Sequence, residues 1–325
     1  MSKRFIDTFV GCGGFSEGLR QAGLTPICGV DIDKAALKTY AANFKNAKVI
    51  QGDVGSNQTI DALKRIKGSK PLYAVVGGPP CQPYSTLNVH KNMGDTRRDL
   101  PMAFVNVCAA LDPKYVVMEE VVAFIKGGHR QRVLDGLARA GYKYITENVI
   151  NAADCGAPTL RKRYIMIACK NQSDLPRNWP PKPLHPKKSV AHALRENRPL
   201  GSPADARPHP KPIIAATQTK IMVKMRHPSK SPYFSQSYGV MDLSKPAMTL
   251  TTQCSHPSTG RFTIQTANGG FRRLSVHEAK VIQGFPSNFY FMKPEGPLNT
   301  LYQAYKQIGN SVSPAMSRAI GNALR

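Results

Sequence analysis

Short apolar runs alternate with helix-length amphipathic segments along the first half of the chain. We predict strands at seven runs rich in branched and aromatic residues, at 4–9, 25–30, 47–51, 72–76, 114–119, 144–150 and 163–169. Between them we predict helices near 15–22, 33–44, 59–67, 101–111 and 129–140. Strands separated by helices are typical of an α/β fold with a doubly wound, mostly parallel sheet covered on both faces.

The composition changes after Lys170. Residues 171–272 hold 15 of the 45 Lys and Arg, 4 of the 20 Asp and Glu, and 14 of the 26 prolines. Proline-rich runs such as 180–188 cannot be helix interiors, so this is either a small loop-rich domain or a partly disordered linker. The β-prone runs at 212–219 and 247–253 favour the domain. The last run, 301–324, is expected to be helical beyond Ser313 and to pack on the first half.

The formal net charge of +25 favours a polyanionic partner, and nucleic acid is the first candidate. A solvated basic surface is the alternative. No run reaches the ~20 apolar residues of a membrane span, and the N-terminus lacks the apolar stretch of a signal peptide. The seven cysteines are scattered without a C-x-x-C pair, which argues against disulfides and against zinc. We therefore expect a reduced, cytoplasmic protein that binds no metal.

The glycine-rich run 7–16, DTFVGCGGFS, follows the first predicted strand and opens a helix, a position where doubly wound sheets bind ligands. Ser16 breaks the G-x-G-x-x-G pattern of dinucleotide binding, which argues against a nicotinamide dehydrogenase. Asp31 and Asp53 follow the next two strands. Each could be a helix cap, but together with the glycine loop they predict a nucleoside-containing cofactor.

The run GGPPCQPYS (77–85) places Cys81 on a proline-stiffened loop after the fourth strand. Cys28, Cys108 and Cys169 fit the usual role of buried small hydrophobes, whereas a rigid loop suits a nucleophile. Glu119 ends the fifth strand and is a candidate proton donor. Its neighbour Glu120 is expected to be the solvated glutamate of the pair.

Arg161 and Arg163 lie two residues apart at the start of the last strand, so they share one face. An exposed strand edge would look the same. Beside a reactive cysteine, however, two guanidinium groups would favour the thiolate and bind a carbonyl or phosphate oxygen of the substrate.

These motifs together resemble the cytosine-C5 DNA methyltransferase family of bacteria and phages. The resemblance rests on DTFVGCGGFS, GPPCQPYS, EEV at 119–121, GAPTLRKRY (156–164), RRLSVHEAKVIQGFP (272–286) and QIGNSV (307–312), which occur in family order. It implies a catalytic, S-adenosylmethionine-binding domain at 1–170 completed by 303–325. It also implies a target recognition domain at 171–272 and a connecting segment at 273–302.

The resemblance also implies a role for individual residues. The catalytic set would be Cys81, Glu119, Arg161 and Arg163. The S-adenosylmethionine site would comprise Phe9, Gly11, Cys12, Gly13, Gly14, Asp31, Ile32, Asp53, Val54, Pro80, Leu100, Asn310, Ser311 and Val312. Duplex DNA would be contacted by Ser85, Thr249, Thr251, Arg272 and Arg273.

Three positions depart from the family's usual pattern. Glu120 stands where the family usually has asparagine, Thr159 where it usually has glutamine, and the run TRRDL, which ends at Leu100, departs from the Arg-Gly that the family usually has before that leucine. The essential residue types survive, so we expect an active monomeric enzyme, with a restriction endonuclease as a separate partner in some hosts. A tRNA methyltransferase of the same family and a non-catalytic DNA-binding relative are the alternatives.

Overall fold

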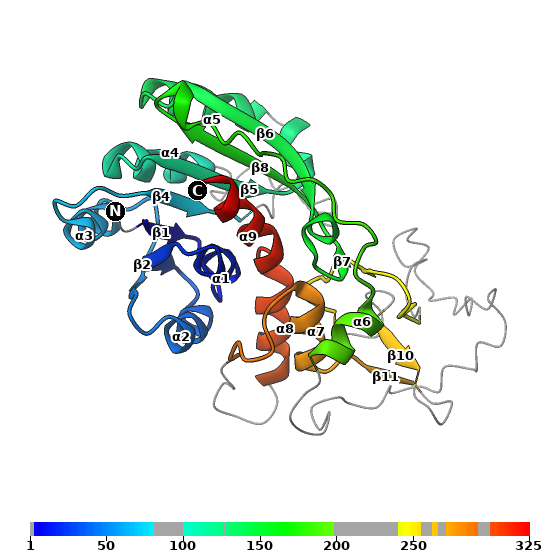
Figure 1. Cartoon of the computed structure of the whole chain (residues 1–325). Coiled ribbons are helices and arrows are strands. Elements are labelled where there is room, and N and C mark those ends of the chain that lie inside the picture. Colours follow the sequence, from blue (N-terminus) through cyan, green and yellow to red (C-terminus); the bar gives the residue numbers. More distant parts are fainter. Residues whose placement is uncertain are drawn as a thin grey trace, which may run out of the picture.

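A seven-stranded sheet lies at the centre of the computed structural model, which describes residues 3–80, 100–126, 128–197, 240–254, 262–265, 271–291 and 300–325 (Figure 1). Its strand order is β3-β2-β1-β4-β5-β8-β6. The strands are β1 (Arg4–Thr8), β2 (Thr25–Asp31), β3 (Lys48–Gln51), β4 (Ala74–Gly77), β5 (Tyr115–Glu120), β6 (Tyr144–Asn151) and β8 (Lys162–Cys169). The first five in this order run parallel, and β8 is antiparallel to both of its neighbours. The predicted mostly parallel α/β sheet is confirmed.

Helices cover both faces of this sheet. One face packs on α1 (Gly14–Gln21) and α9 (Pro314–Ala323), and the other on α3 (Asn57–Lys67), α4 (Leu100–Leu111) and α5 (Gly128–Arg139). Every residue of β5 is buried, with Val117 on the α9 side and Val116 and Met118 on the α4 side. Burial on both faces explains why the central strands read as continuous apolar runs rather than alternating ones.

Local sequence signals set the helix boundaries. The Asp33 side chain accepts hydrogen bonds from the backbone N–H groups of Ala35 and Ala36, so it caps α2 (Lys34–Asn43). Pro314 begins α9, where the missing N–H of proline costs nothing. The prediction of a helix beyond Ser313 that packs on the first half is confirmed, because a Cβ on Gly18 of α1 would lie 2.2 Å from the Pro314 carbonyl oxygen.

One helix near the C-terminus was not predicted. A helix was predicted only beyond Ser313, but the residues before it also form a helix, α8 (Thr300–Asn310). Its buried residues Tyr305 and Ile308 are three positions apart, so they lie on one face of the helix. That face packs into an apolar cluster that is separate from the clusters on the two faces of the sheet. Its other members include Tyr40 and Phe44 of the α2 region and Phe285.

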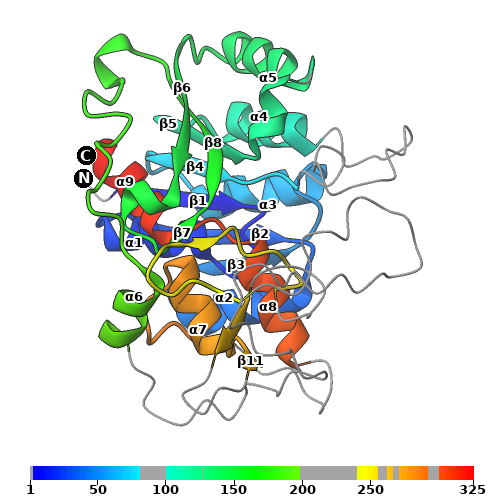
Figure 2. The ribbon, with the colours of Figure 1, turned by 90° about the vertical axis from the view of Figure 1, so that its right-hand side faces the viewer.

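The elements after β8 are short and gather at one end of the molecule. Figure 2 shows α6 (Val190–Glu196), α7 (Val276–Gln283) and α8 together, away from α4 and α5. The remaining short elements are η2 (Val122–Lys126), η3 (Ala152–Cys155), η4 (Gln172–Asp174), β7 (Thr159–Leu160), β9 (Ala247–Met248), β10 (Thr263–Gln265) and β11 (Phe271–Arg273). The β-prone run at 247–253 contributes β9, whereas the run at 212–219 lies outside the described residues.

Candidate active site

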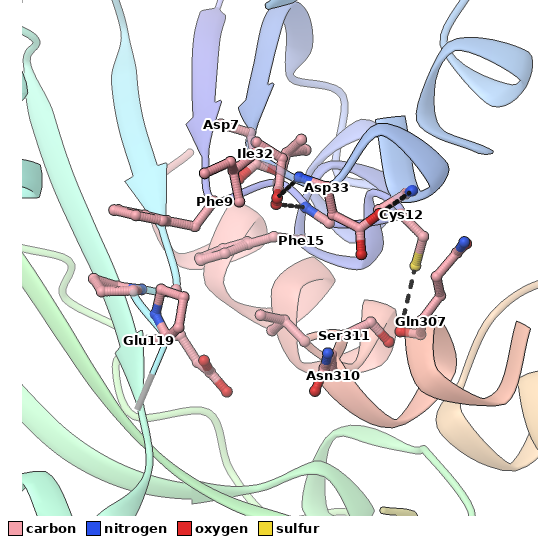
Figure 3. A pocket seen from close by; sticks show the side chains of 18 of the residues that line it. Asp7, Phe9, Cys12, Phe15, Ile32, Asp33, Glu119, Gln307, Asn310 and Ser311 are labelled. Atoms are coloured by element: carbon pink, nitrogen blue, oxygen red, sulfur yellow. Dashed lines mark hydrogen bonds between the residues drawn. The ribbon is translucent and has the colours of Figure 1, made fainter. Parts of the chain in front are cut away.

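A pocket of about 590 Å³ opens at the carboxyl ends of β1, β2, β4 and β5, where doubly wound sheets bind their ligands. Two walls face each other across it. The loop wall comprises the turns after β1, β2 and β3 together with Lys306–Val312 at the end of α8. The carboxylate wall comprises Glu119, Glu120, Arg161 and Arg163 at the ends of β5 and β8. Figure 3 shows Glu119 on one side of the pocket and Asn310 and Ser311 on another.

The Asp31 carboxylate on the loop wall helps to hold the turn after β1. Asp31 accepts a hydrogen bond from the Gly11 N–H at 2.7 Å and another from the Asp33 N–H at 2.8 Å. Burial nevertheless raises the pKa of Asp31, because these two bonds only partly replace its hydration. Phe9 has a φ of 55°, a left-handed conformation that a bulky side chain rarely adopts. Such strain is found where surrounding structure fixes a functional loop.

Gly13 and Gly14 belong to the same turn but do not line the pocket. A Cβ on Gly13 would lie 2.6 Å from the Phe44 ring, and one on Gly14 would lie 2.3 Å from the Val312 carbonyl oxygen. The two glycines therefore allow the turn to pack against α2 and against the C-terminal segment. Their contribution to a ligand site is indirect.

The rest of the loop wall is apolar with a few acceptors. The Ile32 side chain lines the pocket although it is 75% exposed, and Val54, which also lines it, is almost fully buried. Asp53 accepts a hydrogen bond from the Gly55 N–H at 2.9 Å. The residues implied by the family resemblance that line the pocket are Phe9, Gly11, Cys12, Asp31, Ile32, Asp53, Val54, Pro80, Leu100, Asn310, Ser311 and Val312.

The C-terminal segment closes the loop wall. The Ser311 hydroxyl donates to the Ile308 carbonyl, and the Gln283 side chain donates to the Ser311 carbonyl, both at 2.8 Å. Lys306 lies 3.3 Å from the Asp33 carboxylate and so joins α8 to the cap of α2. Lys306 and its neighbour Gln307 line the pocket but were not singled out in the sequence. The helical spacing of Tyr305 and Ile308 is the sequence signal that could have predicted this helix, and with it the positions of Lys306 and Gln307.

Acidic and basic side chains meet on the carboxylate wall. Nε of Arg163 lies 2.9 Å from Oε1 of Glu119, an ion pair that falls outside hydrogen-bond alignment. Arg161 is almost fully buried and donates to the Leu250 carbonyl at 3.3 Å. A Cβ on Gly78 would lie 3.1 Å from Oε2 of Glu119, so only a small residue leaves room for this carboxylate.

Glu120 was predicted to be the solvated glutamate of the pair, but it is buried. Its exposure is 2%, against 8% for Glu119, so that prediction is wrong. The reason is that β8 covers one side of β5, and α4 and η2 cover the face that Glu120 shares with Met118. Burial raises the pKa of Glu120 to about 8.

Two threonines join β7 to β9 beside this wall. The Thr159 hydroxyl donates to the Met248 carbonyl at 3.2 Å, and the Thr249 hydroxyl donates to the Leu160 carbonyl at 2.8 Å. Thr251 packs on α8, because a Cβ on Gly309 would lie 2.4 Å from its carbonyl oxygen. These threonines link the segment after residue 240 to β7 and to α8.

The other residues expected at the site lie away from the pocket or outside the described residues. Arg272 forms hydrogen bonds of 2.6 and 2.7 Å to the Glu278 carboxylate, which also completes the capping box of α7 with Ser275. Thr249, Thr251, Arg272 and Arg273 do not line the pocket. Cys81 and Ser85 lie outside the described residues. The six described cysteines are buried and free, as predicted for Cys28, Cys108 and Cys169.

Comparison with known proteins identifies the family. The family description "C-5 cytosine-specific DNA methylase" matches residues 3–325. The Type II methyltransferase M1.HphI of Haemophilus parahaemolyticus is 29% identical over 336 residues, which cover 100% of this chain and 87% of the relative. M.DdeI of Desulfomicrobium norvegicum is 36% identical over 179 residues, covering 53% of this chain and 41% of that enzyme.

Solved structures agree with this match. An E. coli prophage protein assigned as a DNA modification methyltransferase superposes with a TM-score of 0.70 at 26% identity, covering 99% of this chain and 98% of that one. The Entamoeba histolytica methyltransferase EhMeth superposes with a TM-score of 0.75 at 19% identity over 100% and 98% of the two chains, which shows the shared fold. The chain belongs to the C-5 cytosine-specific DNA methylase family, a family of S-adenosylmethionine-dependent enzymes.

The described residues contain no group of three or more His, Cys, Asp or Glu side chains arranged to bind a metal ion. None of the described helices combines the length and apolar character that crossing a membrane requires.

Proposed function

We propose that this chain transfers a methyl group from S-adenosylmethionine to C5 of a cytosine that is flipped out of a specific duplex DNA sequence, with Cys81 as covalent nucleophile. The observation that carries this proposal is the Glu119–Arg163 ion pair at 2.9 Å, in one pocket with Asp31 and with Pro80, the residue before Cys81. An acid, a cation and the residue that precedes the proposed nucleophile thus line the pocket that would hold the methyl donor.

The loop wall is suited to S-adenosylmethionine. Ile32 presents an apolar surface that a planar base could cover, and Asp31 and Asp53 provide carboxylate oxygens at the ends of neighbouring strands. Phe9, Pro80 and Leu100 provide further apolar surface. We propose that these residues, with Asn310, Ser311 and Val312, bind the cofactor, which when bound supplies an electrophilic methyl group.

In the proposed reaction the Cys81 thiolate forms a bond to C6 of the cytosine while Glu119 donates a proton to N3. The addition would raise electron density at C5, and S-adenosylmethionine, when bound, would supply the electrophilic methyl group and leave as S-adenosylhomocysteine. Loss of the C5 proton to solvent would then restore the C5–C6 double bond and break the C6–sulfur bond, and N3 would return its proton to Glu119. Arg163 would bind the cytosine O2 and orient Glu119, and Arg161 would lie near the nucleophile.

The remaining features concern DNA. A base cannot react inside a stacked duplex, so it must be flipped at a cost of a few kcal/mol. Phosphate contacts from the basic target recognition segment would offset this cost and make binding fall steeply with salt. We further propose that the enzyme acts as a monomer in the cytoplasm. Because these relatives are named Type II methyltransferases, we also propose a separate restriction endonuclease as a partner.

Trapping with duplex DNA that contains 5-fluorocytosine tests the proposal. Fluorine at C5 does not leave as a proton does, so the wild-type protein and S-adenosylmethionine should give a covalent adduct that mass spectrometry maps to Cys81. Cys81→Ala should form no adduct and transfer no methyl group, yet still bind DNA. Cys28→Ala, a change at a buried cysteine outside the pocket, is the matched control and should still form the adduct.

An adduct formed by Cys81→Ala would contradict the assignment of the nucleophile. The substrate is tested by incubating labelled S-adenosylmethionine with duplex DNA and with tRNA in parallel. Transfer to tRNA alone would replace the DNA substrate by the alternative within the family. Binding without transfer or adduct in the wild type would indicate a non-catalytic relative.

A further inference from the structure

Glu120 is a buried acid that the proposed reaction does not use. It is the last residue of β5 and pairs in register with Tyr164 of β8. Its Oε2 accepts a hydrogen bond from the Val121 N–H at 3.0 Å. Its Oε1 is fully buried and has no hydrogen-bond partner among the described residues. Leaving a buried polar atom unpaired costs about 1–3 kcal/mol, and more if it carries charge, so this oxygen calls for an explanation.

The charged groups around Glu120 are few. Glu119 precedes it on β5, and Arg163 precedes its register partner on β8. The Tyr164 hydroxyl is already bonded to Glu147. On the covering elements, α4 contains no charged residue, and Lys126, the charged residue of η2, is exposed.

Arg161 lines the same pocket but bonds to the Leu250 carbonyl. Among the described groups, Arg163 is the cation that acts on both carboxyls, by contact with Glu119 and through its charge on Glu120. Arg163 contacts Glu119 at 2.9 Å, whereas no ion pair joins it to Glu120 in the described structure. Burial is the main reason that the pKa of Glu120 rises to about 8. The Glu119 charge raises it further, while the Val121 N–H and Arg163 oppose the rise.

We propose that Glu120 is a positioning residue that works as a neutral carboxylic acid. When Glu120 is protonated, it leaves Arg163 paired with Glu119. When Glu120 is ionised, it competes with Glu119 for Arg163 and so loosens the position of Glu119. A neutral carboxyl can donate a hydrogen bond from one oxygen and accept one at the other, as the asparagine usual in the family can. The inference rests on the proposed function, because the Glu119–Arg163 pair is the group whose geometry Glu120 controls.

The sign of the pH effect follows from which form is productive. Below pH 8 Glu120 keeps its proton, and Arg163 stays with Glu119. Above pH 8 it ionises, so the rate should fall by about tenfold for each pH unit, as for loss of one essential proton. Glu120→Gln keeps a neutral side chain of the same length at every pH. The ratio of the variant's kcat to the wild-type kcat should therefore rise by about tenfold per unit above pH 8.

An infrared titration tests the protonation state without using activity. Wild-type protein at pH 7 should show the carbonyl stretch of a protonated carboxylic acid, which Glu120→Gln lacks, and this difference should disappear with a midpoint near pH 8. Asp7 is a second buried acid, with its pKa raised to about 7, so Asp7→Asn assigns its separate contribution. Glu120→Asn, the residue usual in the family, is a second variant should the glutamine variant fold poorly.

The outcomes separate the two proposals. If wild type and both Glu120 variants share the same alkaline fall in kcat, or if no band at pH 7 depends on Glu120, the positioning role is wrong and the methyltransferase assignment stands. If the band titrates near pH 8 but no methyl transfer to DNA occurs at any pH, the proposed function is wrong. A band that titrates near pH 8 together with a variant-to-wild-type ratio that rises above it supports both.

Discussion

The two walls of the pocket treat their charged groups in opposite ways. On the loop wall, the acidic side chains accept hydrogen bonds from backbone N–H groups, as Asp31 does from Gly11 and Asp33. On the carboxylate wall, Glu119 contacts Arg163 without hydrogen-bond alignment, and one oxygen of Glu120 has no described hydrogen-bond partner. The turns of the loop wall are thus held in place before any ligand arrives, although the buried Oε1 of Gln307 has no hydrogen-bond partner among the described residues of that wall. The carboxylate wall retains polar atoms that a substrate can satisfy. We infer that the first wall binds and the second reacts.

The largest effect is expected on the carboxylate wall. Arg163→Ala should lower kcat by about 10³-fold, because it removes a preorganised positive charge and leaves Glu119 without its partner. Cofactor affinity should change little, since Arg163 is not part of the loop wall. Single-turnover methyl transfer and calorimetric titration with S-adenosylmethionine measure the two quantities.

Arg130→Ala is the matched control for this charge removal. Arg130 forms a 2.6 Å ion pair with Glu147 away from the pocket. Its loss should leave kcat near the wild-type value. Equal losses of cofactor affinity and of kcat in Arg163→Ala would contradict the division of labour between the walls.

A smaller effect is expected where the loop wall meets the C-terminal segment. Gly14→Ala should lower the free energy of unfolding by about 3 kcal/mol, because the new methyl group would meet the Val312 carbonyl oxygen at 2.3 Å. Urea denaturation measures the change. Gly128→Ala is the control, since no atom of the described residues lies within 4 Å of its added Cβ and its φ is not left-handed. Unchanged stability in Gly14→Ala would show that the close approach is not required.

The smallest effect is expected at the Asp31 carboxylate. Each carboxylate oxygen of Asp31 accepts one hydrogen bond, from the Gly11 or the Asp33 N–H group. Asp31→Asn replaces one of these oxygens with an NH2 donor, so one of the two hydrogen bonds is lost. The dissociation constant for S-adenosylmethionine should rise by about tenfold, or about 1.4 kcal/mol, while the rate at saturating cofactor falls far less than in Arg163→Ala. A kcat loss as large as that of Arg163→Ala would erase the contrast between the walls.

Much of the fold could be predicted because its signals are local. The strands of the central sheet and the helices of the first half are marked by apolar runs, by caps such as Asp33 and by Pro314 at the start of α9. The α8 helix was missed although its apolar residues have helical spacing, because the prediction began the helix only after Ser313.

The burial of the adjacent residues Glu119 and Glu120 could not be predicted from the sequence of β5 alone. Both belong to a strand that is buried on both faces, so alternation does not tell which side chain meets solvent. The answer depends on β8, α4 and η2, which pack on β5 from other parts of the chain. The packing role of Gly13 and Gly14 was missed for the same reason, since Phe44 and Val312 are distant in sequence.

The meeting of the glycine turn with Val312 has a consequence for the order of folding. The pocket combines the turn after β1 with residues at the end of α8, two segments that are far apart in the sequence, and α9 packs against α1. Closing so long a stretch of chain costs entropy that local contacts do not repay. The pocket therefore forms only together with the tertiary fold, and no fragment that lacks either segment can contain it.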